Sequence, residues 1–139
     1  MYEALNAMRR NSAEKNQQIL ARFEQITMTP MEVQKKLLLD LLQEHKDTEY
    51  GRKYGFADIH SIEEYRQRVP LTEYSDYVSY IDRMTENCEE NLISAQKPIW
   101  YNKTSGTAGA PKKIPYSQKQ EIAFRDTVWA ISRAFCTEI

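Results

Sequence analysis

The helical spacing of apolar residues in the first part of this chain constrains its fold more than any other feature. No glycine or proline occurs between residues 2 and 26, and the apolar residues from Ile19 to Ile26 follow a helical period. The next segment, Thr29-Pro30-Met31-Glu32, has a threonine that can cap, a proline suited to the first helical position and a glutamate that can return the capping bond. A leucine-rich stripe follows, so we expect a second helix to run from here to about His45.

Two shorter helices are expected further along the chain. Residues 48–56 contain two of the four glycines and are predicted to form a turn-rich connector. Ser61-Ile62-Glu63-Glu64 has the capping-box pattern, which predicts a short helix that stops before Pro70. The following helix is expected to begin at Thr72 and to stop at Asn87. Its apolar face is predicted to consist of Tyr74, Tyr77, Val78, Ile81 and Met84.

The sequence changes character after about Asn91. Residues 98–101 and 112–116 are rich in aromatic and β-branched residues and are predicted to form two short strands. A long helix is expected after Ser117, and one of its faces is predicted to carry Phe124, Val128, Ile131 and Phe135. The predicted fold class is therefore α+β, with a mainly helical region at residues 1–95 and then, at residues 96–139, a short β-hairpin followed by a long helix. The apolar pattern continues to Ile139, so we expect this chain to be a fragment of a longer protein.

Composition excludes several classes of function. The 139 residues include 19 basic and 20 acidic ones, and no basic block stands out, so we expect no nucleic-acid partner. The longest apolar run is too short to span a bilayer and the N-terminus lacks a signal-peptide pattern, so we expect no membrane partner and a cytoplasmic location. Cys88 and Cys136 show no metal-type spacing, so no metal site is predicted. Two free thiols are favoured, and a disulfide stays open.

Residues 103–112, between the two predicted strands, have the composition of a phosphate-binding loop. Residues 104–109 read Thr-Ser-Gly-Thr-Ala-Gly, which places three hydroxyls and two glycines close together. Glycine lets successive backbone N–H groups converge on one point, and the hydroxyls add donors. Lys103, Lys112 and Lys113 can supply positive charge. The spacing fits neither a Walker loop nor the dinucleotide fingerprint, so phosphate binding and a plain polar hairpin loop are both open from composition alone.

The loop resembles the Ser/Thr/Gly-rich phosphate loop of adenylate-forming enzymes, and the sequence before it narrows the resemblance. Residues 48–56, 68–71, 74–77 and 80–84 are similar, in order and spacing, to the start of the auxin-responsive acyl-acid amido synthetases and their bacterial relatives. The resemblance covers roughly residues 30–135. It implies that residues 96–139 begin the large α/β N-terminal domain of an adenylate-forming enzyme.

This resemblance implies a two-step ligase reaction with ATP and Mg²⁺. A small-molecule carboxylic acid attacks the α-phosphate to give an acyl-adenylate, and an amine, typically an amino acid, then displaces AMP to form an amide. By the match, Ser105, Gly106, Thr107 and Gly109 line the phosphates, with Thr104 and Lys112 in support. Ala108 belongs to the same loop but stands where many relatives carry Ser or Thr, so one phosphate contact is in doubt. The match assigns no catalytic residue to these positions, and we expect the chain by itself to be inactive.

Two alternatives stay open at this point. One is an acyl- or aryl-CoA ligase, because the acceptor would be chosen by residues outside this chain. The other is a non-catalytic helical interaction domain in which the loop is a plain hairpin. Other polar residues are given structural interpretations: packing tyrosines at 74, 77 and 80, surface charges at Asp82 and Arg83, and surface or capping histidines at 45 and 60. The identity of the acid and of the amine, and the oligomeric state, are not predicted.

Overall fold

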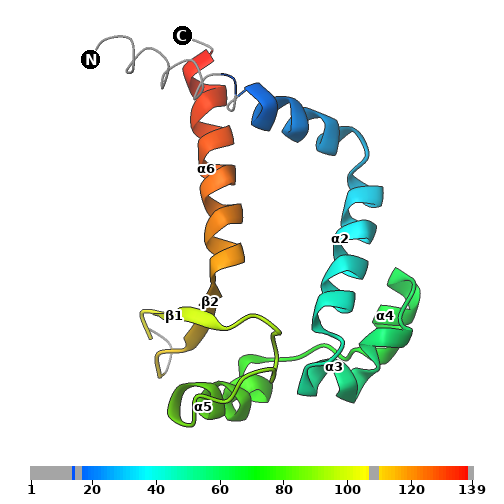
Figure 1. Cartoon of the computed structure of the whole chain (residues 1–139), viewed down its shortest axis with the longest axis vertical. Coiled ribbons are helices and arrows are strands. Elements are labelled where there is room, and N and C mark those ends of the chain that lie inside the picture. Colours follow the sequence, from blue (N-terminus) through cyan, green and yellow to red (C-terminus); the bar gives the residue numbers. More distant parts are fainter. Residues whose placement is uncertain (1–13, 15–16, 107–109, 138–139) are drawn as a thin grey trace. The chain divides into compact units, whose positions relative to one another are not determined.

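The computed structural model of the chain describes residues 14, 17–106 and 110–137, except for the side chains of residues 130 and 133–137 (Figure 1). Residues 17–28 are helical. The elements that follow are α2 (Pro30–His45), α3 (Glu49–Tyr54), the 3₁₀-helix η1 (Phe56–Asp58), α4 (Ile62–Arg68), the 3₁₀-helix η2 (Tyr74–Tyr77), α5 (Val78–Glu86), β1 (Pro98–Lys103), β2 (Lys113–Ser117) and α6 (Gln118–Thr137).

The predicted fold class is confirmed: a mainly helical region precedes a two-stranded antiparallel hairpin and a long helix. Contacts between residues group the chain into two units, residues 34–118 and the terminal residues 1–33 with 119–139. The core and the candidate site both lie within residues 34–118. The division of the sequence near residue 95 stays a prediction.

Several helix boundaries follow from local signals in the sequence. As predicted, α2 begins at Pro30 and ends at His45. The Ser61 hydroxyl accepts a hydrogen bond from the Glu64 backbone N–H at 3.1 Å, so α4 starts at the predicted cap. Glu64 accepts the return bond from the backbone N–H of His60 at 2.7 Å, one residue before the Ser61 N–H of a standard capping box. Asn87 follows the last residue of α5, as predicted.

The prediction of a turn-rich connector at residues 48–56 is wrong for most of that segment, because residues 49–54 form α3. Thr48 caps the helix: its hydroxyl accepts a hydrogen bond from the Gly51 N–H at 2.9 Å and donates one to the His45 carbonyl at 2.7 Å. Gly51 is required by close packing, since a Cβ atom there would lie 2.1 Å from the His45 carbonyl oxygen. This glycine therefore marks a tight helix approach and not a turn.

The first turn of α3 also uses a distant segment to satisfy its backbone. The N–H of Glu49 donates to the Asn91 carbonyl at 2.8 Å, and the N–H of Tyr50 donates to the Leu92 carbonyl at 2.9 Å. Together with the Thr48 cap, these bonds satisfy N–H groups that a helix start leaves without intrahelical partners. They also hold the segment that leads into β1 against α3.

The helix predicted to begin at Thr72 begins instead as η2. Glu73 and Asp76 form a reciprocal capping box at its start. A 3₁₀-helix has three residues per turn, so side chains three positions apart lie above one another. In the α-helix α5 that follows, Tyr80 is buried, whereas Val78, which was predicted on the apolar face, is exposed.

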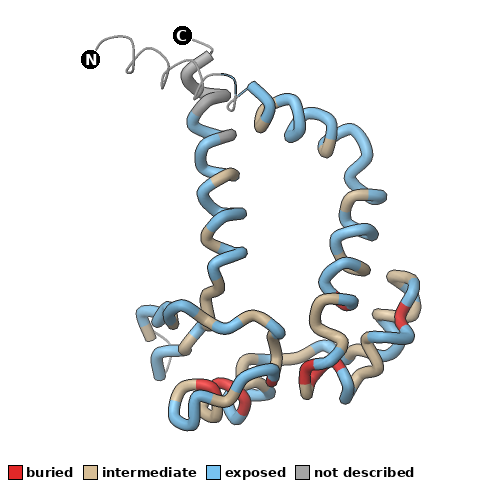
Figure 2. The backbone as a smooth tube through the Cα atoms, viewed as in Figure 1, coloured by how far each residue is buried: buried red, intermediate tan, exposed pale blue. Residues whose placement is uncertain are grey.

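One hydrophobic cluster within residues 34–118 is built mainly from aromatic side chains. Its buried members, Tyr50, Tyr80, Met84 and Leu92, come from α3, α5 and the segment before β1, where Figure 2 shows buried positions in red. The Tyr50 ring contacts four neighbouring aromatic rings at centroid distances of 4.6–6.1 Å, those of Tyr54, Phe56, Tyr77 and Tyr80. Burial of the Tyr50 phenol raises its pKa, so this hydroxyl stays neutral and can share hydrogen bonds within the cluster.

Helix α6 begins directly after the hairpin, as predicted, and its predicted apolar face is exposed. Phe124, Val128 and Ile131 all lie in contact with solvent, while the side chain of Phe135 lies outside the described residues. In the part of the chain that the structure describes, no helix is both long and apolar enough to cross a lipid bilayer.

Replacing Thr48 with Val should lower the free energy of unfolding by about 1–2 kcal/mol, because the cap is lost and the buried Gly51 N–H has no acceptor. Thr48→Ser keeps the hydroxyl and should lose less stability than the valine variant. Urea denaturation of the three chains measures the difference. A Thr48→Val chain as stable as the unsubstituted one would show that the cap does not stabilise the α2–α3 junction.

Candidate functional site

The candidate loop is carried by the β1–β2 hairpin. The strands pair in antiparallel register, from Pro98 opposite Ser117 at one end to Lys103 opposite Lys113 at the loop. The opposed rings of Trp100 and Tyr116 stack at a centroid distance of 4.7 Å and an interplanar angle of 15°, which adds a cross-strand contact to the backbone bonds. The hairpin therefore holds the two ends of the loop, residues 103 and 112, close together.

Thr104 and Lys112 meet across the base of the loop. The N–H of Thr104 donates to the Lys112 carbonyl at 3.1 Å, and the N–H of Lys112 donates to the Thr104 hydroxyl oxygen at 3.0 Å. The Thr104 hydroxyl thus acts as an acceptor toward the loop base, and its own proton is left for another partner. The two residues therefore close the base of the loop, and their supporting role toward phosphate stays a prediction.

The remaining candidate residues divide into two groups. Ser105 is exposed, and Gly106 has a φ of +67°, the left-handed conformation that glycine adopts without strain. Thr107, Ala108 and Gly109, which were also predicted to bind phosphate, lie outside the described residues. The described part of the loop thus presents a hydroxyl and a turned backbone to solvent, as a ligand-binding loop requires.

The three flanking lysines differ in where their charges lie. The Lys112 ammonium lies 5.2 Å from the centroid of the Tyr74 ring, a cation–π arrangement. The Lys113 ammonium instead faces α5, 3.7 Å from a carboxylate oxygen of Asp82 and 3.3 Å from the Thr85 hydroxyl. Lys103 is exposed. Of the charges predicted to serve the loop, that of Lys113 is therefore engaged elsewhere.

An open depression of about 700 Å³ lies between the C-terminal arm of the loop and the η2–α5 segment. Tyr74 and Asp82 line one side of it, and Pro111 and Lys112 line the other. Its walls thus combine a ring face, a carboxylate and an ammonium group beside the loop. A polar ligand bound at the loop can extend into this space.

Tyr74 is the site residue that sequence reasoning missed. Its hydroxyl accepts a hydrogen bond from the Lys113 N–H at 2.8 Å and donates one to the Lys113 carbonyl at 3.3 Å. The sequence indicated only a packing tyrosine with its hydroxyl at the rim. No local signal identifies the partner, because it lies 39 residues further along the chain.

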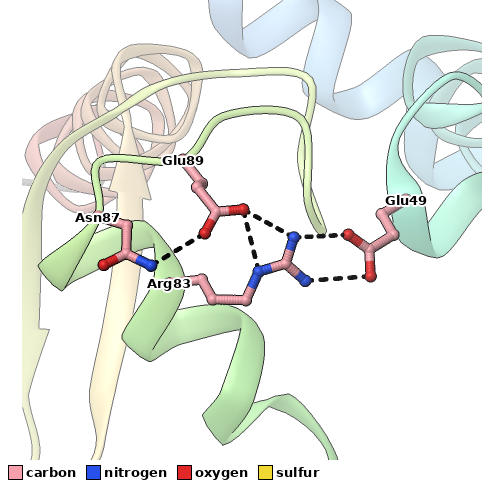
Figure 3. A network of polar contacts seen from close by, with 4 residues as sticks. All are labelled: Glu49, Arg83, Asn87 and Glu89. Carbon is pink, nitrogen blue, oxygen red and sulfur yellow. Dashed lines mark hydrogen bonds and ion pairs between the residues drawn. The ribbon is translucent and has the colours of Figure 1, made fainter.

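Arg83, interpreted from the sequence as a surface charge, is the centre of an ion-pair network (Figure 3). Its guanidinium binds both carboxylate oxygens of Glu49, at 2.9 and 3.1 Å. It also binds one oxygen of Glu89, at 2.7 and 3.0 Å, while Asn87 donates to the other oxygen. The network ties α5 to α3 and to the turn after α5, so its role is structural.

The network lowers the pKa values of its two carboxyl groups. The hydrogen bond from Arg83 holds the pKa of the Glu49 carboxyl below its ordinary value of 4.5. Hydrogen bonds from Arg83 and then from Asn87 lower the pKa of Glu89 in the same way. The two carboxylates together raise the pKa of the Arg83 guanidinium.

The remaining polar candidates also have structural roles or surface positions. The His45 ring accepts a hydrogen bond through Nδ1 from the Ala95 N–H at 3.1 Å, which connects the end of α2 to the segment before β1, and His60 is exposed. Cys88 is a free, exposed thiol, and the side chain of Cys136 lies outside the described residues. Within the described residues, no group of three or more His, Cys, Asp and Glu side chains is placed to hold a metal ion.

Residues 19–138 match the GH3 family N-terminal domain, and the chain belongs to this family. The resemblance noted in the sequence is thereby confirmed at the level of the family.

Individual relatives carry the names of amido synthetases. The chain is 27% identical to the jasmonoyl-L-amino acid synthetase GH3.3 of Oryza sativa subsp. japonica over 84% of its length, and 23% identical to the indole-3-acetic acid-amido synthetase GH3.6 of Arabidopsis thaliana over 92%. It is 36% identical to GH3.9 of Arabidopsis thaliana over 70% of its length. The chain spans only 17–25% of the length of these three relatives.

The Arg83 network should make the free energy of unfolding depend on pH in the acid range. The folded-state pKa values of Glu49 and Glu89 lie below the ordinary 4.5, so their contribution is fully present above pH 4.5 and is lost as the pH falls through the folded values. In Arg83→Met, the free energy of unfolding should therefore fall less steeply as the pH drops below 4.5. Urea denaturation at a series of pH values measures the slope.

Arg66→Met is the matched control for this experiment. Arg66 is an exposed arginine of α4 that lies outside the network, so its removal should leave the acid slope unchanged. Equal slopes in the Arg83→Met and unsubstituted chains would contradict the assignment of the acid-sensitive stability to this network.

Proposed function

We propose that the chain is the N-terminal part of an ATP-dependent ligase that adenylates a carboxylic acid and transfers the acyl group to an amino acid, forming an amide. Membership in the GH3 family, whose named relatives are amido synthetases, carries this proposal. The family also favours an amine over coenzyme A as the acceptor. Because the chain spans about a fifth of its relatives, the reaction is proposed for the full-length protein that contains these residues.

In this proposal, residues 103–112 bind the phosphates of ATP. The hydroxyls of Thr104, Ser105 and Thr107 donate to phosphate oxygens, while Gly106 and Gly109 let the backbone turn its N–H groups toward the same point. Lys112 adds positive charge at the edge of the loop. The exposed Ser105 and the left-handed Gly106 support this assignment, because both leave donors accessible to a ligand.

The chemical task of the loop follows from the charge that moves in the first step. When the carboxylate oxygen bonds to the α-phosphorus, the bond to the bridging oxygen breaks and negative charge accumulates on pyrophosphate. Donors that are already in position lower the free energy of that transition state without reorganising. Mg²⁺ bound to the nucleotide would neutralise part of the phosphate charge and would need few protein ligands.

Loss of two loop hydroxyls should weaken this step. In the full-length protein, Ser105→Ala combined with Thr107→Ala should slow ATP–pyrophosphate exchange. The expected rise in the activation free energy is roughly 1–3 kcal/mol per lost charge-assisted contact. The assay uses ATP with indole-3-acetate, jasmonate or benzoate as the acid. Ser79→Ala, at an exposed serine of α5, is the matched control and should leave the exchange unchanged.

Two results would contradict the proposal. Unchanged exchange in the double variant removes the loop from the mechanism. When coenzyme A and amino acids are both supplied, formation of only acyl-coenzyme A and AMP from the adenylate, with no amide from any of the common amino acids, overturns the amide-forming step. Mass spectrometry of the products distinguishes the two acceptors.

A further inference from the structure

We infer that Tyr74 is a positioning residue for the phosphate-binding loop, and that its hydroxyl fixes the C-terminal arm of the loop to the aromatic core. This inference rests on the proposed function, since residues 103–112 are the group that Tyr74 positions. Tyr74 itself lies at the start of η2, outside the loop. Three features of the structure carry the inference: the strand edge at Lys113, the route from η2 to the core, and the position of Lys112.

The backbone groups of Lys113 need partners from outside the hairpin. In an antiparallel pair, residues alternate between positions that bond across the ladder and positions whose N–H and C=O point away from the partner strand. Thr104 and Lys112 bond across the ladder, so at the next pair, Lys103 and Lys113, the backbone groups point outward. On β2 these outward groups meet Tyr74, at 2.8 Å for the N–H and 3.3 Å for the carbonyl.

A phenol is well suited to this position. Its hydroxyl offers one donor and two acceptor sites, so one oxygen atom can satisfy both backbone groups of a single residue. Tyr74 therefore substitutes for a neighbouring strand at this edge. A two-stranded hairpin is only marginally stable alone, so a bond to another element determines how firmly the base of the loop is held.

The element that carries Tyr74 is itself attached to the core. Tyr77 lies one 3₁₀ turn after Tyr74, and its hydroxyl is 3.2 Å from that of Tyr50 and 2.6 Å from that of Thr72. The rings of Tyr50 and Tyr77 have centroids 5.6 Å apart, and Tyr50 is buried. Hydrogen bonds and ring contacts thus lead from the buried core through Tyr77 and Tyr74 to the backbone of the loop arm.

Tyr74 also influences the charge at the loop. Its ring lies 5.2 Å from the Lys112 ammonium, so the residue that binds the backbone of Lys113 also places the side chain of Lys112. An aromatic face attracts a cation without neutralising it as a carboxylate does. The ammonium is therefore held beside the depression in a form that still attracts phosphate.

Paired tyrosine variants of the full-length protein test this role. Tyr74→Phe removes the bonds to Lys113 and keeps the ring. Tyr77→Phe, the matched control on the same turn, removes the hydroxyl contacts to Tyr50 and Thr72 and keeps the ring contact that attaches η2 to the core. In ATP–pyrophosphate exchange with indole-3-acetate, jasmonate or benzoate, Tyr74→Phe should raise KM for ATP about 5- to 20-fold, as expected for two lost hydrogen bonds. It should leave KM for the acid unchanged. Tyr77→Phe should lower Tm and leave KM for ATP unchanged.

The outcomes separate positioning from general stabilisation. An unchanged KM for ATP in Tyr74→Phe, or equal increases in both variants, overturns the inference. If the unsubstituted protein shows no ATP–pyrophosphate exchange with any of the acids, the proposed function fails. Amide hydrogen exchange then tests separately whether Tyr74 holds the loop arm. Faster exchange of the backbone amides of residues 112 and 113 in Tyr74→Phe than in Tyr77→Phe supports its hold on the loop, and equal rates overturn it.

Discussion

The way in which the first turn of α3 satisfies its backbone determines much of the remaining structure. A helix of six residues is too short to be stable by itself, so its free N–H groups must bind something outside the helix. Thr48 satisfies one of them, and the carbonyls of Asn91 and Leu92 satisfy two more. Because residues 91 and 92 lead into β1, the same bonds hold the root of the hairpin. Arg83 reinforces the junction by binding Glu49 at the start of the helix.

From this junction, the aromatic cluster extends support to the proposed site. Tyr50 lies in the helix that the junction stabilises, contacts Tyr77 on η2, and η2 carries Tyr74 to the loop arm. A loop that must offer N–H and hydroxyl donors to a phosphate cannot also use them to stabilise its own conformation. The donors are free for a ligand only if other groups fix the ends of the loop. Tyr74 binds Lys113 just after the C-terminal arm, and at the base the Thr104 hydroxyl acts as an acceptor only. Such preorganisation reduces the free energy that binding spends on ordering the loop.

The sequence predicted those features whose causes are local. The start of α2 at Pro30, the capping box at Ser61 and the stop at Asn87 each depend on a few adjacent residues, and the structure agrees with all three. Helix α3 was missed because two of its stabilising contacts come from residues about forty positions away, and because Gly51 resembles a turn residue until its packing against His45 is seen. The exposure of Val78 and the 3₁₀ geometry of η2 were not predicted, whereas Tyr80 packs in the core as expected.

In the candidate site, too, the features with local causes were predictable from the sequence and those that depend on distant residues were not. Composition and order along the chain identified the loop, and the pairing of Thr104 with Lys112 across its base was implicit in two flanking strands. The sequence did not predict where the Lys112 and Lys113 side chains point. Their partners, Tyr74 and Asp82, are distant in sequence and come close to the loop only in the folded chain. This direction affects the proposed chemistry. A loop that bound every phosphate equally in the substrate and in the transition state would lower KM without raising kcat. With Lys113 bound to Asp82 and Lys112 held over a ring, the proposed site would rely mainly on oriented neutral donors, whose interaction would strengthen as charge develops on the leaving pyrophosphate.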